Sequence, residues 1–281
     1  MVDLHTHSTC SDGTLTPTEL VALAAQSGIT ALALCDHNNV DGLPEFLEAA
    51  AIHGIDAVPG VEFSTEYQGA ELHILGLFIR EERYEAVRTR LAKLLEDKDR
   101  SNRDLIRSLA GEGIELDYAA IKAATPGGLV NRAVIAADMV RRGYCGSVQE
   151  AFNQWLSPKR GHFHPPKRPD ALDTISFIRS IGAVAVLAHP FLNLESGSLR
   201  RFLEEAVPLG LQAMEVFYPS FTPAQTAEAE KLVREFDLLP SGGSDFHGEN
   251  KPHIRLGTGR GDLRVPRSWF EALRAVNFPG K

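Results

Sequence analysis

The chain has 281 residues, 43% of them hydrophobic, and a formal net charge of −8 at pH 7. This length allows one large core, and the acidic balance argues against long duplex nucleic acid as a partner. No run approaches the ~20 apolar residues of a membrane span, no signal-peptide pattern opens the chain, and Cys10, Cys35 and Cys145 are too few and too scattered for a disulfide framework, so we expect a cytoplasmic protein without a membrane partner.

The first part of the chain alternates short apolar runs with helical patterns. A strand in "VDL" ends at His5. The next segment, 16–28, predicts a helix with Thr16 as N-cap, Pro17 as first helical residue and Glu19 closing a capping box. Strands are then expected at 29–37, 56–64 (ending near Glu62) and 70–78, with a helix at 43–54.

The last part of the chain returns to the same alternation. Strands are expected at 183–190, 211–218 and 238–245, and helical patterns at 170–181, 198–207 and 222–236. Strand–helix alternation over this length predicts an α/β fold with a mainly parallel sheet, most simply a barrel.

The stretch 82–165 does not follow this strand–helix alternation, because its pattern predicts several helices without a strand between them. We therefore expect two domains: 1–97 with 166–281 as the barrel, and 98–165 as a small helical insert.

Histidines and acids recur in or just after the predicted strands. Residues two apart on a strand point to the same side, so His5 and His7 can direct two imidazoles at one point. One such pair is weak evidence, and His162 and His164 form a second copy in "GHFHPP". The recurrence is what matters, since strand ends converge on one mouth of a barrel. The candidates are His5, His7, Asp12, Asp36, His37, Glu62, His73, His189, Asp245 and His247.

Such a cluster has an electrostatic problem, because packed carboxylates repel and buried charge is costly without compensation. Divalent metal ions solve it, since imidazole and carboxylate are usual ligands of Zn, Mn and Fe. The candidates are too many for one tetrahedral site, so two or three ions fit better, placed to clamp a phosphate.

Six motifs in chain order carry a family resemblance: "HTHSTCSDG", "CDHNNV", "PGVEFS", "LHILGL", "LAHP" and "GGSDFHG". Together they resemble the PHP family, named for polymerase and histidinol phosphatase. The resemblance implies a distorted seven-stranded TIM-like (β/α) barrel with two or three divalent ions, Mn preferred and Fe or Zn as alternatives. It implies three ligand sets: His5, His7, Glu62 and Asp245; bridging Glu62 with His73 and His189; and Asp12, His37 and His247.

The helical insert is similar to that of the branch containing nucleoside-3′,5′-bisphosphate phosphatases and a 5′-to-3′ exoribonuclease. In that branch the insert caps the barrel mouth, and the resemblance implies that Arg100 and Arg132 hold a second phosphate of the substrate. Two positions depart from the family pattern: Ser101 stands where some relatives have arginine, and Val134 where many have histidine. Both departures concern substrate choice rather than phosphoester hydrolysis.

The resemblance implies a phosphoesterase. The candidate catalytic residues are Asp12, Asp245 and His247, and either Asp245 or His247 would manage protons near the nucleophile. The preferred substrate is a nucleoside 3′,5′-bisphosphate that loses its 3′-phosphate, or a short 5′-phosphorylated oligonucleotide trimmed from its 5′ end. Alternatives are a phosphatase of another small metabolite such as histidinol phosphate, a metal-dependent amidohydrolase, and a non-enzymatic metal-binding or polymerase-accessory module.

Overall fold

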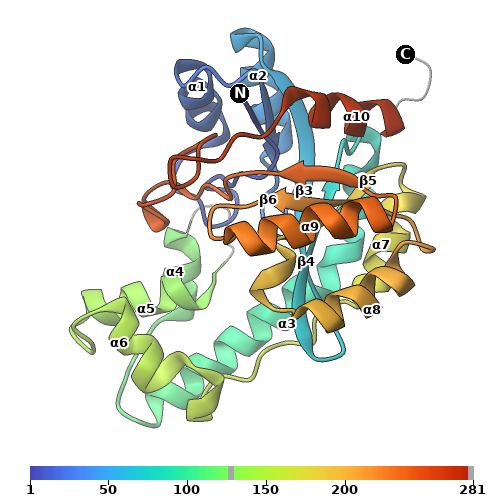
Figure 1. Ribbon diagram of the computed structural model, residues 1–281. Helices are drawn as coiled ribbons and strands as arrows, with labels where there is room; N and C mark the ends of the chain where they lie inside the picture. Colours follow the sequence, from blue (N-terminus) through green and yellow to red (C-terminus); the bar gives the residue numbers. More distant parts are fainter. Residues whose placement is uncertain (126–129, 278–281) are drawn as a thin grey trace. The chain divides into compact units, whose positions relative to one another are not determined.

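The computed structural model describes residues 1–125 and 130–277 (Figure 1). Residues 126–129 and 278–281, which the predicted domains include, lie outside the described residues. The chain divides into two compact units. Met1–Arg88 with Pro169–Lys281 form the first, called here the sheet unit, and Thr89–Arg168 form the second, called the helical unit.

The sheet unit is built on one curled sheet, which has seven strands over the described residues and the same order in space as in the chain. The strands are β1 (Val2–Asp3), β2 (Ala31–Leu34), β3 (Asp56–Tyr67), β4 (Ala70–Leu77), β5 (Val184–Ala188), β6 (Leu211–Phe217) and β7 (Leu239–Gly242). Neighbouring strands are parallel except that β4 runs antiparallel to both β3 and β5. The fold is therefore mixed α/β with a mainly parallel sheet, as predicted.

Strands β3 and β4 form a long hairpin joined by a two-residue turn. Gln68 and Gly69 both have positive φ, 50° and 83°, as this kind of tight turn requires. The sequence predicts that this strand ends near Glu62, whereas β3 continues to Tyr67 because the hairpin extends it. Since β4 runs the opposite way, its first half lies at the edge where the parallel strands end, and this places His73 there.

The segments that follow β1 and β7 meet and bring the two ends of the sheet together. Leu4 N donates to Gly242 O at 3.3 Å, and Asp245 N donates to His5 O at 2.8 Å. Gly243 permits this approach, because a Cβ there would lie 2.5 Å from His5 N. The first and last motifs of the chain therefore become neighbours.

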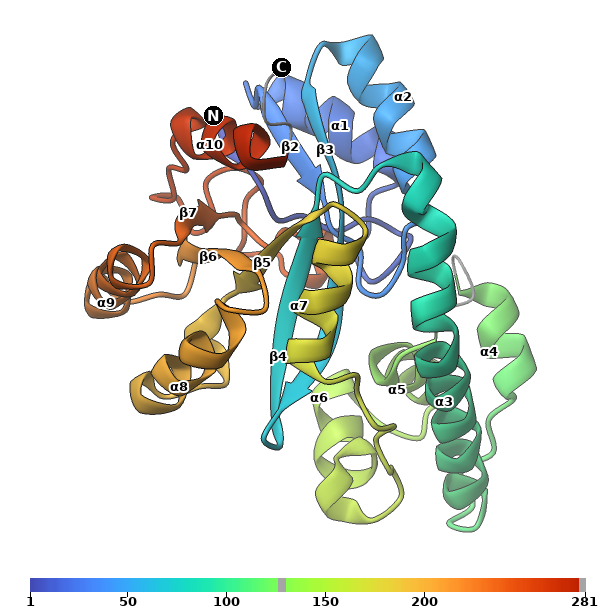
Figure 2. The ribbon, with the colours of Figure 1, turned by 90° about the vertical axis from the view of Figure 1, so that its right-hand side faces the viewer.

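Six helices of the described sheet unit flank this sheet: α1 (Pro17–Gln26), α2 (Leu43–His53), α7 (Ala171–Ser180), α8 (Ser196–Ala206), α9 (Pro223–Glu235) and α10 (Arg267–Asn277). Helix α7 lies along β3 and β4 (Figure 2), and α9 lies on β6. The predicted capping box is present at Thr16 and Glu19. Apolar side chains of β1, β2, β4 and β5 form the core, among them Val2, Ala33, Leu75 and Val186.

Helix α3 (Tyr84–Ala110) begins in the sheet unit and continues into the helical unit, which also contains α4 (Tyr118–Ala124), α5 (Arg132–Arg141) and α6 (Val148–Ala151). No strand occurs in its described part, 89–125 and 130–168. Leu105, Leu109, Ile135, Met139 and Leu156 belong to an apolar core of its own.

Among the described residues, no helix combines the length and the apolar character needed to cross a bilayer. Cys10, Cys35 and Cys145 are free thiols. The cytoplasmic location stays a prediction.

Candidate metal centre

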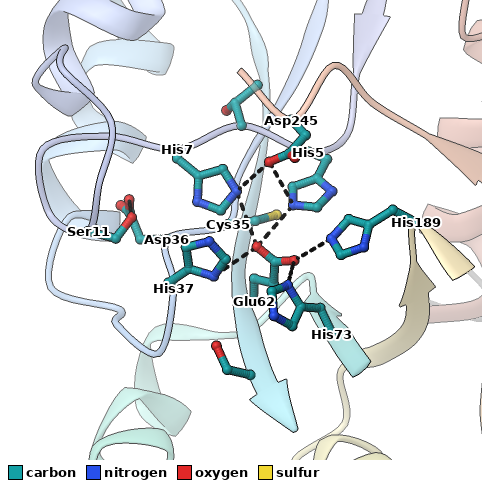
Figure 3. Close-up of polar contacts among 12 residues, drawn as sticks. His5, His7, Ser11, Cys35, Asp36, His37, Glu62, His73, His189 and Asp245 are labelled. Atoms are coloured by element: carbon teal, nitrogen blue, oxygen red, sulfur yellow. Dashed lines mark hydrogen bonds and ion pairs between the residues drawn. The ribbon is translucent and has the colours of Figure 1, made fainter. Parts of the chain in front are cut away.

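The histidines and acids with a predicted ligand role come together at one place in the sheet unit, and Figure 3 labels most of them. They are His5, His7, Asp12, His37, Glu62, His73, His189, Asp245 and His247. They come from segments up to 242 positions apart in the chain, and the order of the strands brings them to the same edge of the sheet.

Glu62 stands at the centre of the cluster and has no exposed surface. Its Oε2 atom lies 3.2 Å from Nε2 of His5 and 3.2 Å from Nε2 of His7. The same oxygen lies 3.0 Å from Nδ1 of His37. Three imidazoles from the segments after β1 and β2 therefore face one carboxylate oxygen.

The other oxygen of Glu62 faces a second set of imidazoles. Its Oε1 atom lies 2.7 Å from Nδ1 of His73 and 3.0 Å from Nε2 of His189. The remaining ring nitrogen of His73, Nε2, lies 3.2 Å from Glu71. Glu62 thus lies between two groups of histidines, one at each of its oxygens.

Asp245 presents one oxygen to the cluster and has the other held by neighbours. Its Oδ1 atom lies 3.1 Å from Nε2 of His7 and 3.8 Å from Nε2 of His5. Its Oδ2 atom accepts hydrogen bonds from the Tyr218 hydroxyl at 2.8 Å and the Lys251 ammonium at 2.6 Å. These two donors fix the carboxylate so that Oδ1 points inward.

Asp12 lies on the loop after β1 and meets two further imidazoles. Its Oδ1 atom lies 3.2 Å from Nε2 of His247 and 3.9 Å from Nε2 of His37. The other nitrogen of His247, Nδ1, donates to the main-chain oxygen of Asp245 at 2.8 Å. Because Nδ1 is used in that bond, Nε2 is the ring nitrogen of His247 that faces Asp12.

Within the described residues, three groups of side chains have potential ligand atoms that lie within 4.8 Å of one another. They are His5, His7, Glu62 and Asp245; His37, Glu62 and His73; and His7, Asp12, His37 and His247. The first group is the same as the first predicted ligand set. The second contains His37, whereas the prediction has His189, and the third also contains His7.

Buried polar atoms without a hydrogen-bond partner concentrate in this cluster. The described residues contain seven such side-chain atoms, and five are Nε2 of His5, both ring nitrogens of His7, Nδ1 of His37 and Oε2 of Glu62. Each unpaired group of this kind costs ~1–3 kcal/mol. Divalent cations would satisfy several of them at once, since imidazole nitrogen and carboxylate oxygen are their usual ligands. The residues therefore fit bound metal.

The acids and imidazoles of this cluster shift one another's pKa values. Although burial disfavours the charged forms, the nearby carboxylates of Asp245 and Glu62 raise the pKa of His7 to about 9, and the charge of Glu62 raises the pKa of His73 to about 9. Burial and the neighbouring imidazoles instead lower the pKa of His37 to about 3. Despite its burial, Glu62 has a pKa far below its usual range because of the surrounding imidazoles.

Two more buried acids fix the backbone around the cluster. Asp36 accepts hydrogen bonds from Ser8 N at 2.8 Å, Ser8 Oγ at 2.6 Å and Ser11 Oγ at 2.6 Å. Asp3 accepts from Ser244 N at 2.8 Å and from the hydroxyl of the same residue. Asp36, a candidate in the sequence analysis, thus holds the loop after β1 instead of facing the cluster.

Sequence reasoning missed Glu215, Tyr218 and Lys251. Glu215 accepts hydrogen bonds from His5 and His189, and the other two hold Asp245. A charged residue inside the apolar run "LQAMEVF" was an available signal for Glu215, because a buried acid needs partners. No pattern marks Lys251, whose role depends on the loop after β7 folding back.

The predicted substrate-binding arginines lie in the helical unit. Arg100 is exposed and pairs with Asp97. The guanidinium of Arg132 lies 4.3 Å from the centre of the Phe163 ring and donates to Leu156 O at 3.2 Å. Their role toward a substrate stays a prediction.

The two departures and the second histidine pair also lie in the helical unit. Ser101 is buried and donates to the main-chain oxygen of His164. Val134 packs against the apolar core of this unit. His162 contacts Ser108 Oγ through Nδ1 at 2.9 Å. Ser101 and Val134 thus have structural contacts of their own.

The chain matches the PHP domain family over residues 3–155. It is 33% identical over 250 residues to a 5′-3′ exoribonuclease of Haemophilus influenzae, covering 87% of this chain and 89% of the relative. It is 30% identical over 248 residues to a 3′,5′-nucleoside bisphosphate phosphatase of Chromobacterium violaceum, covering 88% and 87%.

A solved structure of a metal-dependent phosphoesterase from Bifidobacterium adolescentis has the same fold, with a TM-score of 0.84 and 24% identity over 98% of this chain and 96% of that one. The sequence matches confirm the predicted family and the predicted class, a phosphoric ester hydrolase. The chain belongs to the PHP domain family.

Proposed function

We propose that this enzyme is a metal-dependent phosphatase of nucleoside 3′,5′-bisphosphates, removing the 3′-phosphate, and that it also trims short 5′-phosphorylated oligonucleotides from the 5′ end. The observation that carries the proposal is the buried cluster around Glu62, whose unpaired nitrogens and oxygens suit several cations. The similarity to a bisphosphate phosphatase and to an exoribonuclease over most of the chain supports this substrate class.

We propose two or three divalent ions, with Mn²⁺ preferred. His5, His7, Glu62 and Asp245 would hold one, Glu62 with His73 and His189 a second, and Asp12 with His37 and His247 a third. When bound, divalent ions supply positive charge to a phosphate and acidify water. The shared position of Glu62 favours ions close enough to act on one phosphate.

The chain's own residues would orient the substrate and handle protons. His247 has Nδ1 tied to a carbonyl oxygen, so its Nε2 is the atom able to exchange a proton near Asp12. Asp245 is held at Oδ2 by Tyr218 and Lys251, which leaves Oδ1 for the reaction centre. The proposed catalytic residues are therefore Asp12, Asp245 and His247.

We further propose that the segment 98–165 forms the insert domain that covers the barrel mouth, with 1–97 and 166–281 as a distorted (β/α)₇ barrel. Arg100 and Arg132 would then hold the second phosphate of the substrate, since guanidinium groups bind phosphate oxygens in pairs. The separate apolar core of the helical unit supports treating it as a domain.

The test is phosphate release from a panel of substrates in the presence of Mn²⁺. Adenosine 3′,5′-bisphosphate and a 5′-phosphorylated RNA pentamer should be hydrolysed in preference to histidinol phosphate. Chelation should abolish the activity and added Mn²⁺ should restore it. Activity that is indifferent to the chelator would contradict the metal mechanism, and a preference for histidinol phosphate would contradict the substrate.

A control variant separates the metal centre from the rest of the protein. His189→Ala should bring turnover to background while the thermal unfolding of the metal-free protein changes little. A fully active His189→Ala enzyme would remove His189 from the proposed site.

A further inference from the structure

Glu215 is a fully buried acid in the middle of β6. Each of its two oxygens accepts one hydrogen bond. Oε1 accepts from Nδ1 of His5 at 2.9 Å, and Oε2 accepts from the main-chain N of His189 at 2.6 Å. One carboxylate therefore contacts residues from two proposed metal sites.

The bond to His5 sets which nitrogen of the imidazole is available. A carboxylate only accepts hydrogen bonds, so Nδ1 of His5 must carry the proton. The opposite nitrogen, Nε2, is buried without a hydrogen-bond partner and lies 3.2 Å from Glu62 Oε2. Glu215 thus holds the ring with Nε2 directed at the centre of the cluster, and in the neutral ring this nitrogen carries the lone pair that a metal ion would use.

The bond to His189 holds a strained backbone. His189 has φ 29° and ψ 58°, in the left-handed region that non-glycine residues rarely occupy. The short bond from its N–H to a charged oxygen stabilises this conformation, and the ring then reaches Glu62 Oε1 through Nε2 at 3.0 Å. A relaxed backbone would point the ring elsewhere.

We propose that Glu215 is a positioning residue that prepares His5 and His189 together, so that two of the proposed metal sites depend on one buried carboxylate. The inference rests on the metal dependence of the proposed function. Asp36 offers a contrast, because its carboxylate accepts from Ser8 and Ser11 and organises the loop on the opposite side, where Asp12 lies. The site of Asp12, His37 and His247 should not depend on Glu215.

The geometry needs two accepting oxygens on one side chain. Glutamine has the same shape but a single acceptor, so its NH₂ group would face either Nδ1–H of His5 or N–H of His189. Glu215→Gln is therefore the sharpest variant. Glu215→Asp keeps the charge but is shorter by one methylene, so it should satisfy one partner and recover part of the effect.

The experiment measures Mn²⁺ binding without substrate, by electron paramagnetic resonance of free Mn²⁺. Glu215→Gln should weaken binding of the ions at the first two sites by about 10–100-fold, with the third within about twofold. Glu215→Asp should lie between the wild type and Glu215→Gln. The matched control is Glu205→Gln, which alters an exposed acid that accepts from the Tyr67 hydroxyl, and should bind as the wild type does.

Two results would overturn the proposal. Unchanged Mn²⁺ affinity in Glu215→Gln is one. Equal weakening of every site, together with a lower unfolding temperature of the metal-free protein, is the other, because it marks a general structural role. Nuclear magnetic resonance of the Zn²⁺-loaded wild type should also show a slowly exchanging Nδ1 proton on His5, and its absence would count against the proposal. Phosphate release by the wild type is scored separately, so the proposed function can fail while Glu215 still positions metal ligands, or the reverse.

Discussion

The two units of this molecule differ in where their charged side chains lie. The sheet unit buries its histidines and acids around Glu62, and five of their ring nitrogens and oxygens are buried without a hydrogen-bond partner. The helical unit has an apolar core, and several of its arginines pair at the surface with acids three or four residues away, as in Arg103–Asp99 and Arg107–Asp104. A buried cluster of this kind needs an added cation, whereas surface pairs contribute little energy. Substitutions should therefore have large effects in the first unit and small ones in the second.

The largest effect is expected at Glu62. Glu62→Gln removes the charge that faces two sets of imidazoles. If Glu62 bridges two metal ions as proposed, turnover should fall by about 10³-fold or more. The measurements are phosphate release and metal content. Glu66→Gln, four residues further along the same strand, is the matched control and should keep both. A Glu62→Gln enzyme with full metal content would contradict the bridging role.

The contrast between the units also explains what the sequence could predict. Side chains two residues apart on a strand point to the same side, so His5 and His7 lie together. The ends of parallel strands lie at one edge of the sheet, so short local patterns were enough to predict which side chains form the cluster. Local patterns predict a strand end near Glu62, whereas β3 continues past it because pairing with β4 extends the strand, and that pairing leaves no local signal. Glu215 was missed because its partners, His5 and His189, come from other strands.

The helical unit was harder to interpret for a physical reason. Its helical character follows from the absence of strand patterns, but the partner of an arginine depends on tertiary packing. Arg132 stacks on Phe163, thirty-one positions away, and nothing in the local sequence indicates that contact. Predictions about phosphate binding by this unit therefore depend on the family resemblance alone.

The second-largest expected effect is a dependence of metal affinity on pH. The pKa values of His7 and His73 are about 9 in the metal-free protein, so both carry a proton at pH 7. A metal ligand must be neutral imidazole, so binding displaces these protons, and affinity should rise about tenfold per pH unit for each displaced proton from pH 6 toward 9. Titration calorimetry in buffers of different ionisation enthalpy measures the release. A binding enthalpy independent of buffer would argue against protonated histidines at the site.

A smaller effect is expected in the helical unit at Arg132. If its guanidinium binds the second phosphate, Arg132→Ala should raise KM for adenosine 3′,5′-bisphosphate by about tenfold, as loss of one charge-assisted contact does. KM for adenosine 3′-monophosphate, which lacks the second phosphate, should stay within about twofold. Arg141→Ala on the same helix is the control, since Arg141 pairs with Asp138. Equal losses on both substrates would mean that Arg132 acts through packing on Phe163.

The smallest effect tests the surface pairs themselves. Asp99 accepts hydrogen bonds from Tyr118 Oη at 2.7 Å, Lys122 Nζ at 2.7 Å and Arg103 Nε at 2.8 Å. Although partial burial opposes ionisation, these donors lower the pKa of Asp99 below its unfolded value. The resulting stability is present above the unfolded pKa near 4 and is lost as the pH falls toward the folded pKa.

Asp99→Asn should therefore lower the free energy of unfolding by about 1 kcal/mol at pH 7, and by progressively less below pH 4. Urea unfolding at both pH values measures the difference, and Asp104→Asn, at an exposed pair with Arg107, serves as the control with a smaller change. Because Asp99 lies outside the metal cluster, Mn²⁺ affinity should be the same in both variants and the wild type. A loss of metal binding in Asp99→Asn would show that the energies of the two units are coupled, and the separation between buried and surface charge drawn above would then fail.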